Sequence, residues 1–95
     1  MARKGEMKDM DRYEQSIRDN AIAYSVVCFQ PGTSSRTYAT FDSVDYSIAY
    51  GKQILSEPNR IRSVMIYAID EHDHHALMGT INRDLKYKEV VPKVH

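Results

Sequence analysis

The densest group of candidate metal ligands in this chain is Asp70, Glu71, His72, Asp73, His74 and His75. Imidazole and carboxylate together suit zinc, nickel or copper, and a loop could bring His72 and His74 to one ion. No second group with ligand spacing occurs elsewhere, apart from the terminal His95. A solvated turn is therefore the simpler interpretation, and a metal-binding enzyme or sensor that uses His72, His74 and His75 is kept as an alternative.

The candidate nucleophiles lack the surroundings that catalysis requires. Cys28 lies inside an apolar run, whereas a reactive thiolate needs exposure and a positive neighbour, so we interpret it as a small buried hydrophobe. No nucleophile-elbow motif surrounds Ser25, Ser34 or Ser35. The sequence therefore predicts no catalytic residue, no cofactor and no enzyme activity.

Basic residues occur in two groups that could contact nucleic acid. Arg60 and Arg62 flank the start of a predicted strand, and the C-terminal group contains Arg83, Lys86, Lys88 and Lys93 around Tyr87. However, 13 Lys and Arg balance 13 Asp and Glu, so the net charge is zero, which argues against broad attraction to a polyanion. A weak nucleic-acid binder through the basic C-terminal segment is kept as a second alternative.

Two segments, 21–30 and 61–70, are apolar at both odd and even positions. Strands with two apolar faces must be covered on both sides. Residues 31–35 have turn chemistry and predict a hairpin to a more polar strand at 36–41. A further strand is predicted at 76–82. Residues 86–95 could be a short edge strand or a tail.

A helix is predicted at 42–56, with Asp42 as the N-cap and Phe41 packed on Tyr46 at its start. It ends at Glu57-Pro58. Its predicted inward face consists of Val44, Ser47, Ile48, Gly51, Ile54 and Leu55. Because Gly51 lies in the middle of this face, we expect the helix backbone to approach a strand closely there.

These elements predict a single α+β domain, with an N-terminal helical arm at 1–20, a ββαββ core at 21–82 and a basic strand or tail at 83–95. Two hairpins and one helical crossover give a four-stranded, mainly antiparallel sheet of order 2-1-3-4. The polar second strand and the fourth strand, interrupted by Gly79, take the edges. The same element order occurs in LAGLIDADG homing endonucleases, but the motif that names them is missing here.

The predicted helix at 42–56 covers one face of this sheet and leaves the other apolar and open. Three covers are possible: the N-terminal helix through Met7, Met10, Tyr13 and Ile17, a second copy of the chain, or an unrelated protein. Tyr46 and Tyr50, with Lys52 beside them, are predicted on the outer side of the helix. The predicted partner-binding residues are Tyr46, Tyr50, Lys52, Met65 and Tyr67.

The function that these features favour is a small non-catalytic protein-binding module that acts as a homodimer. In size and lack of motifs it is similar to accessory and inhibitor proteins of bacteriophages and mobile elements, anti-CRISPR proteins among them, an analogy of type without motif residues. No apolar run is long enough to span a membrane, and one cysteine cannot form an internal disulfide. We therefore expect a soluble cytoplasmic protein with a protein partner.

Overall fold

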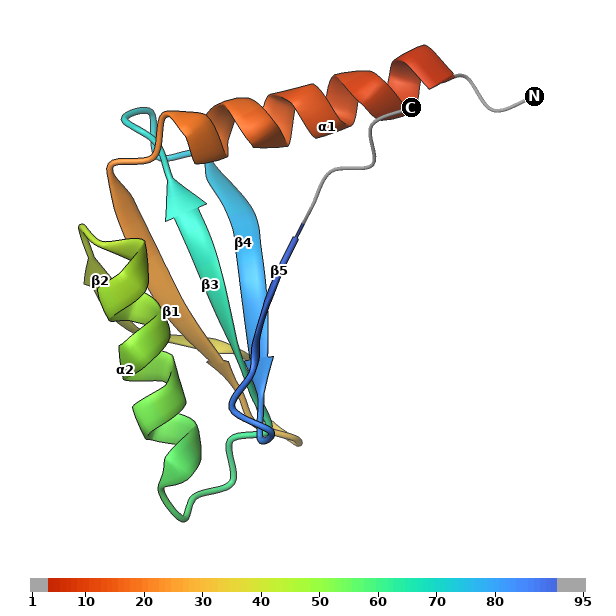
Figure 1. The fold of residues 1–95 in the computed structure, drawn as a ribbon. Coiled ribbons are helices and arrows are strands. Elements are labelled where there is room, and N and C mark those ends of the chain that lie inside the picture. The colour runs from red at the N-terminus through yellow and green to blue at the C-terminus, as the bar shows by residue number, and fades with distance from the viewer. Residues whose placement is uncertain (1–3, 91–95) are drawn as a thin grey trace.

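The computed structural model describes residues 4–90, with side chains from residue 11 onward, as one antiparallel sheet and two helices (Figure 1). In chain order the elements are α1 (Lys4–Asp19), β1 (Ala23–Phe29), β2 (Arg36–Phe41), α2 (Val44–Ser56), β3 (Ser63–Ile69), β4 (His75–Asn82) and β5 (Tyr87–Glu89). The side chains of Met7 and Met10, together with Lys93 and His95, lie outside this description. The α+β class is confirmed.

The sheet has the strand order β2-β1-β3-β4-β5, and all four pairs are antiparallel. The predicted order of the first four strands is confirmed, but the prediction of four strands is wrong. Residues Tyr87–Glu89 form a short fifth strand, in which Tyr87 pairs with Ile81 and Glu89 pairs with Gly79. The edge is therefore β5 and not β4, as the right-hand side of Figure 1 shows.

The prediction that Gly79 weakens an edge strand is wrong, because β4 is not an edge. Gly79 instead makes room for the aromatic ring of Tyr87 in β5. A Cβ atom at Gly79 would lie 2.5 Å from ring atoms of Tyr87, so no side chain fits there without displacing the ring. The Tyr87 hydroxyl is buried and has no hydrogen-bond partner. Burial raises the pKa of Tyr87 to about 12, with Glu89 adding to the increase and Arg18 opposing it.

The N-cap of α2 is Ser43, and the prediction of Asp42 is wrong by one residue. Ser43 has an extended backbone, and its hydroxyl accepts a hydrogen bond of 3.2 Å from the backbone N–H of Tyr46. Because the helix begins at Val44, Asp42 stands one residue before the capping position. The predicted contact at the helix start is present, since the Phe41 and Tyr46 rings meet edge to face at 4.7 Å.

The inward face of α2 is the predicted one, with Ser47, Gly51, Ile54 and Leu55 buried and Val44 and Ile48 half-buried against the core. The close approach predicted at Gly51 is also confirmed. A Cβ atom there would lie 2.9 Å from Cγ1 of Val64 and 3.1 Å from Cδ1 of Ile81. The main core lies between α2 and the sheet and contains Val26, Cys28, Ile54, Leu55, Ile61, Val64, Ile66 and Ile81.

The other helix, α1, packs against β4 and β3 across one end of the sheet (Figure 1). Ile17 is 2% exposed, and Nε of Arg18 donates a hydrogen bond of 2.8 Å to the carbonyl of Leu77. The charge of Arg18 also acts on Tyr87, whose ring packs against the core beneath α2. Both helices therefore lie on the same face of the sheet. The N-terminal helix was one of three possible covers for the opposite face, and it does not lie there.

Two irregularities interrupt the ladder. The register between β1 and β2 shifts between Val26 and Val27, where Tyr38 has no partner, and that between β3 and β4 shifts between Ile66 and Tyr67, where Met78 has none. The carbonyl of Met78 instead accepts a hydrogen bond of 2.8 Å from the N–H of Val90. An extra residue in one strand bends that strand and increases its local twist.

We predict that Gly51→Ala destabilises the fold by up to about 2 kcal/mol. The better helix propensity of alanine contributes about 1 kcal/mol, but overpacking typically costs about 1–3 kcal/mol. The second effect prevails because Val64 and Ile81 are fully buried and cannot move aside. Urea unfolding measures the change, and Ala49→Gly on the exposed side of α2 is the control for propensity alone. A Gly51→Ala variant as stable as the wild type would show that the side chains of Val64 and Ile81 can move to accept the new Cβ atom.

A second substitution tests the buried hydroxyl of β5. Tyr87→Phe removes a desolvated group without a partner, so we expect the free energy of unfolding to stay unchanged or to rise by up to about 1 kcal/mol. Tyr38→Phe, at a side chain that is 47% exposed, is the control, with an expected change within about 0.5 kcal/mol. A clear loss of stability in the Tyr87 variant would mean that its hydroxyl has a partner.

Candidate functional site

The face of the sheet opposite the helices, here called the open face, is the candidate site. No helix among residues 4–90 packs on it. The register assigns to it one parity of the two central strands and their neighbours: Ala23, Ser25, Val27 and Phe29 of β1, Ser63, Met65, Tyr67 and Ile69 of β3, Leu77 and Thr80 of β4, and Thr37 and Thr40 of β2. The same register adds His75 and Asn82 of β4 and Lys88 of β5. The central strands β1 and β3 carry no charged side chain on this face, whereas its border carries Lys88. This is the uncovered apolar face that the sequence predicts.

The centre of the open face is apolar and its border is polar. Val27, Met65, Tyr67, Ile69 and Leu77 are half-buried, each sheltered only by its neighbours on the face. In the sheet, Met65 lies directly opposite Val27, and the Tyr67 hydroxyl lies 3.9 Å from the sulfur of Met65. Threonine and serine side chains of β2, β3 and β4 surround this centre. An apolar centre inside a polar rim is the usual anatomy of a protein interface.

The predicted partner-binding residues do not form one surface. Met65 and Tyr67 lie on the open face, whereas Tyr46, Tyr50 and Lys52 lie on α2, on the other side of the sheet. The structure therefore divides the predicted site into two separate surfaces.

Of the two tyrosines on α2, only Tyr46 stands out from the surface. Tyr46 is 59% exposed, and its ring is held against Phe41. Tyr50 is half-buried, because its ring packs against Phe41 at 5.2 Å and against the core. Its predicted place on the outer side of the helix is therefore only partly correct.

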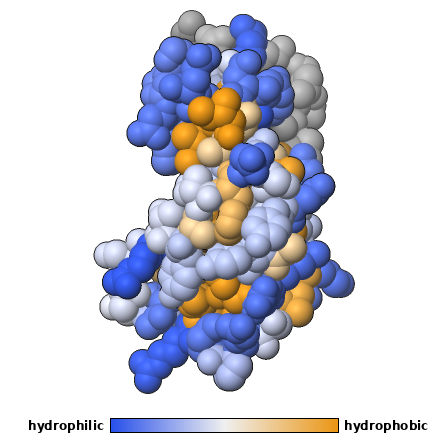
Figure 2. Space-filling view, turned by 90° about the vertical axis from the view of Figure 1, so that its left-hand side faces the viewer, coloured by the Kyte–Doolittle hydropathy of each residue, from blue (hydrophilic) through white to orange (hydrophobic). Residues whose placement is uncertain are grey.

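Figure 2 shows the molecule from the side that is on the left in Figure 1, where apolar and polar atoms alternate. Orange atoms gather in separate patches bordered by blue, below α1 and in the lower half of the molecule. Ile22 and Tyr38 are among the exposed large side chains of the molecule. Scattered apolar residues of this kind are normal on a protein surface, so the open face, with its contiguous apolar centre, is the stronger candidate.

The histidine-rich segment forms the turn between β3 and β4 and is held by Asp70. One carboxylate oxygen of Asp70 accepts hydrogen bonds from the N–H of His72 at 3.0 Å and of His74 at 2.8 Å. Desolvation acts to raise the pKa of this carboxyl, but those two hydrogen bonds and the two imidazoles together hold it below its ordinary value. Nε2 of His75 lies 3.0 Å from the carboxylate of Asp73.

The same turn does not gather its imidazoles around one point. The ring centroids of His72 and His74 are 5.9 Å apart, and His74 also faces Tyr13 of α1 at 5.9 Å. Among the residues that the structure describes, no three histidine, cysteine or carboxylate side chains are placed to hold a metal ion. The geometry therefore gives the metal alternative no support.

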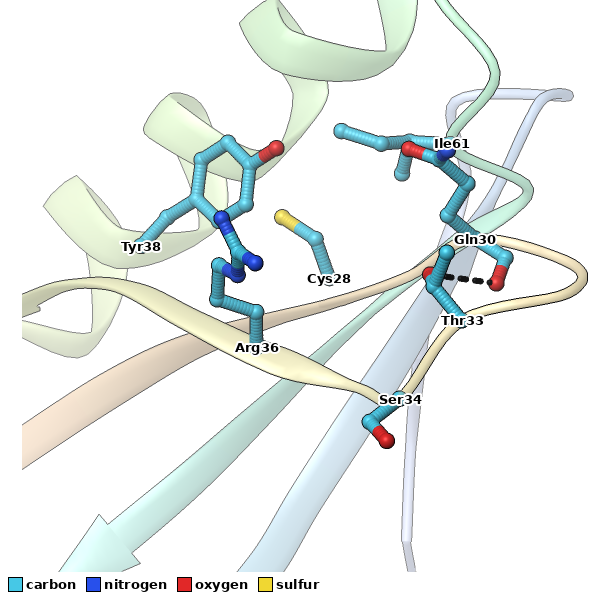
Figure 3. Close-up of a pocket in the computed structure, with 7 residues that line it drawn as sticks. All are labelled: Cys28, Gln30, Thr33, Ser34, Arg36, Tyr38 and Ile61. Carbon is cyan, nitrogen blue, oxygen red and sulfur yellow. Dashed lines mark hydrogen bonds between the residues drawn. The ribbon is translucent and has the colours of Figure 1, made fainter.

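Cys28 is 3% exposed, and burial raises the pKa of its thiol to about 11, so its place in the core is as predicted. Its sulfur points toward the α2 side of the sheet, beside a hollow of about 180 Å³ at the β1–β2 turn (Figure 3). The hollow is lined by Cys28, Gln30, Thr33, Ser34, Arg36, Tyr38 and Ile61. A thiol with this pKa is protonated near neutral pH, so Cys28 is not an activated nucleophile.

Arg83, predicted as part of a basic surface, has a structural function that the sequence did not reveal. Its Nη1 donates to the carbonyls of Leu55 at 2.6 Å and Glu57 at 3.1 Å, and its Nη2 donates to the carbonyl and side-chain oxygens of Asn59 at 2.6 and 2.7 Å. It thereby satisfies carbonyls at the C-terminal end of α2. The sequence shows that a helix ends before Pro58 and so leaves backbone carbonyls in need of a donor. It does not show which distant side chain binds them.

No protein-family model, curated protein or solved structure matches this chain in the comparisons made. None of the helices described is both long and apolar enough to pass through a lipid bilayer.

We predict that Asp70→Ala lowers the midpoint of thermal unfolding at neutral pH. Because the folded pKa of Asp70 lies below its unfolded value of about 3.9, its stabilising contribution is present above that value and disappears as the pH falls through the folded pKa. The difference from the wild type should be present above about pH 5 and shrink below about pH 4. Calorimetry across this range measures it. The neighbouring Glu71→Ala is the control, and equal losses in both variants would refute the assignment to Asp70.

Proposed function

We propose that this chain is a non-catalytic protein-binding module that docks through the open face, and that its first partner is a second copy of itself. The observation that carries the proposal is the placement of both helices on one face, which leaves the other face, with its uncharged apolar centre on β1 and β3, without cover from residues 4–90. An exposed apolar patch on the order of several hundred Å² is often an interaction site.

A second copy suits this surface because the open face is self-complementary in chemistry. Its central side chains carry no charge, and the chain has a net charge of zero, so two copies meet without electrostatic repulsion. Two sheets commonly pack face to face about 10 Å apart, with their inner side chains interdigitated. A two-fold arrangement would place Met65 and Tyr67 of both copies near the centre of the contact.

The size of the face sets the expected strength of the dimer. Four strands of about seven residues and the three-residue β5, spaced about 4.8 Å apart with about 3.3 Å per residue, together present roughly 500 Å². Two such faces bury on the order of 1,000 Å² in total, which is near the lower limit for a specific interface. We therefore expect a dissociation constant in the micromolar range.

The same proposal includes an action on another protein, as an accessory or inhibitor. In a dimer joined at the open faces, both α2 helices point outward, and each presents one Tyr46 that Phe41 holds in place. A rigid, exposed aromatic side chain is a frequent anchor of protein recognition. The buried free thiol of Cys28 suits a reducing compartment such as the cytoplasm.

The test is the oligomeric state in solution. Light scattering over roughly 1–200 µM, a range that brackets the expected affinity, should show the mass rising from one chain toward two. Met65→Lys places a charge at the centre of the open face and should weaken association at least 100-fold. Tyr46→Lys is the matched control on the helix side and should dimerise like the wild type.

Two results would overturn the proposal. One is a wild-type protein that stays monomeric at the highest concentration. The other is a Met65→Lys variant that still dimerises as the wild type does, because the contact would then use another surface.

A further inference from the structure

Three arginines from two separate segments converge at the end of the sheet where α2 terminates. Arg60 and Arg62 lie in the connection just before β3, and Arg83 directly follows β4. They line two adjoining hollows of about 320 and 530 Å³, which share Pro31, Arg62 and Arg83. The first also contains Asn59, Arg60 and Ile61, and the second contains Phe29, Ser63 and Asn82. We call these two hollows together the arginine groove.

The positive charge of the arginine groove is not neutralised within the described part of the chain. No carboxylate lines either hollow. Arg83 binds carbonyl and amide oxygens and no acid, while Arg60 and Arg62 are exposed and make no ion pair with any residue described. Of the nearby acids, Asp84 lies 3.9 Å from Lys88. Arg60 and Arg62 thus present exposed guanidinium groups beside Arg83, whose guanidinium is bound to oxygen atoms of the fold.

The neutral net charge of the chain hides local concentrations of charge. At the opposite end of the sheet, Asp42 and the turn residues Asp70, Glu71 and Asp73 are acidic, and Arg18 of α1 adds one positive charge there. The arginine groove lies at the other end, and Arg83 also masks the carbonyls of α2 that would otherwise repel an anion there. Net charge therefore understates the local attraction that an anion would experience.

The groove also has an aromatic side chain suited to stacking. Phe29 is 39% exposed and lines the larger hollow together with Arg62. Exposed phenylalanine beside free arginine is the combination with which proteins bind unpaired bases and their phosphates. Both hollows are shallow and open, which suits a strand passing over the surface better than an enclosed small molecule.

We propose that the arginine groove binds a short segment of single-stranded nucleic acid, with phosphates on Arg60 and Arg62 and a base on Phe29. Arg83 acts as a fixed positive charge, since four of its five N–H groups are already used within the fold. The amide side chains of Asn59 and Asn82 are the remaining polar groups at the groove. This site uses residues at the margin of the open face and is separate from its apolar centre.

The test is fluorescence anisotropy of labelled dT12 and rU12 at about 50 mM salt, with the full chain. We expect binding in the micromolar range. The double variant Arg60→Gln/Arg62→Gln should weaken it at least tenfold and reduce the slope of log affinity against log salt by about 1.4, for two lost phosphate contacts. Phe29→Leu should weaken it roughly tenfold without changing the slope.

The matched control is Lys86→Gln/Lys88→Gln, which removes the same charge from the C-terminal segment and should weaken binding less than threefold. Circular dichroism shows whether each variant is folded. Absence of binding at 50 µM protein, or equal losses in both double variants, would overturn the proposal. Equal competition by poly-glutamate of matched charge would also overturn it and would identify the groove as a site for acidic proteins.

Discussion

The close approach of α2 to the sheet at Gly51 determines how the rest of the molecule is arranged. With no side chain at this position, the helix rests on Val64 and Ile81 and covers the central strands along only part of their length. Ala68 and Ala76, farther along the same face, are buried toward the end of the sheet where α1 packs. One face of the sheet is thus covered by both helices, α2 over the central strands and α1 at one end.

This division explains why the opposite face stays bare. An amphipathic helix such as α1 can pack on any apolar surface, and both faces of the central strands are apolar. The choice is made by particular contacts: Ile17 is buried, and Arg18 reaches the carbonyl of Leu77. These contacts could not be read from the spacing of Met7, Met10, Tyr13 and Ile17, which predicted a helix but not its place.

The predictable parts of the fold are those that the sequence marks by a regular spacing of apolar residues or by a residue with special geometry. The two-faced strands, the polar second strand and the inward face of α2 are of this kind, as is the close contact at Gly51. The fifth strand was left undecided because it is three residues long and has one apolar side chain, Tyr87. The role of Gly79 was wrongly predicted because a glycine in a strand can mark either a weak edge or a place where a neighbouring group approaches closely.

The candidate site shows the same division. Met65 and Tyr67 were identified because they follow the alternation of a strand, and the contributions of Phe29 and Leu77 follow from the register. The grouping of Arg60, Arg62 and Arg83 could not be predicted, because they meet only through the antiparallel pairing of β3 with β4. In the sequence they belong to two separate basic groups, one before β3 and one after β4.

The two interruptions of the ladder, at Tyr38 and Met78, have a consequence for any protein that meets the sheet. Each adds right-handed coiling to its strand, so the uncovered surface is a saddle and not a plane. A saddle fits closely only against a surface whose curvature has the matching hand. Flat sheets, such as those in fibrillar aggregates, would touch it at few points. Its shape therefore disfavours nonspecific sheet stacking, although its centre is apolar.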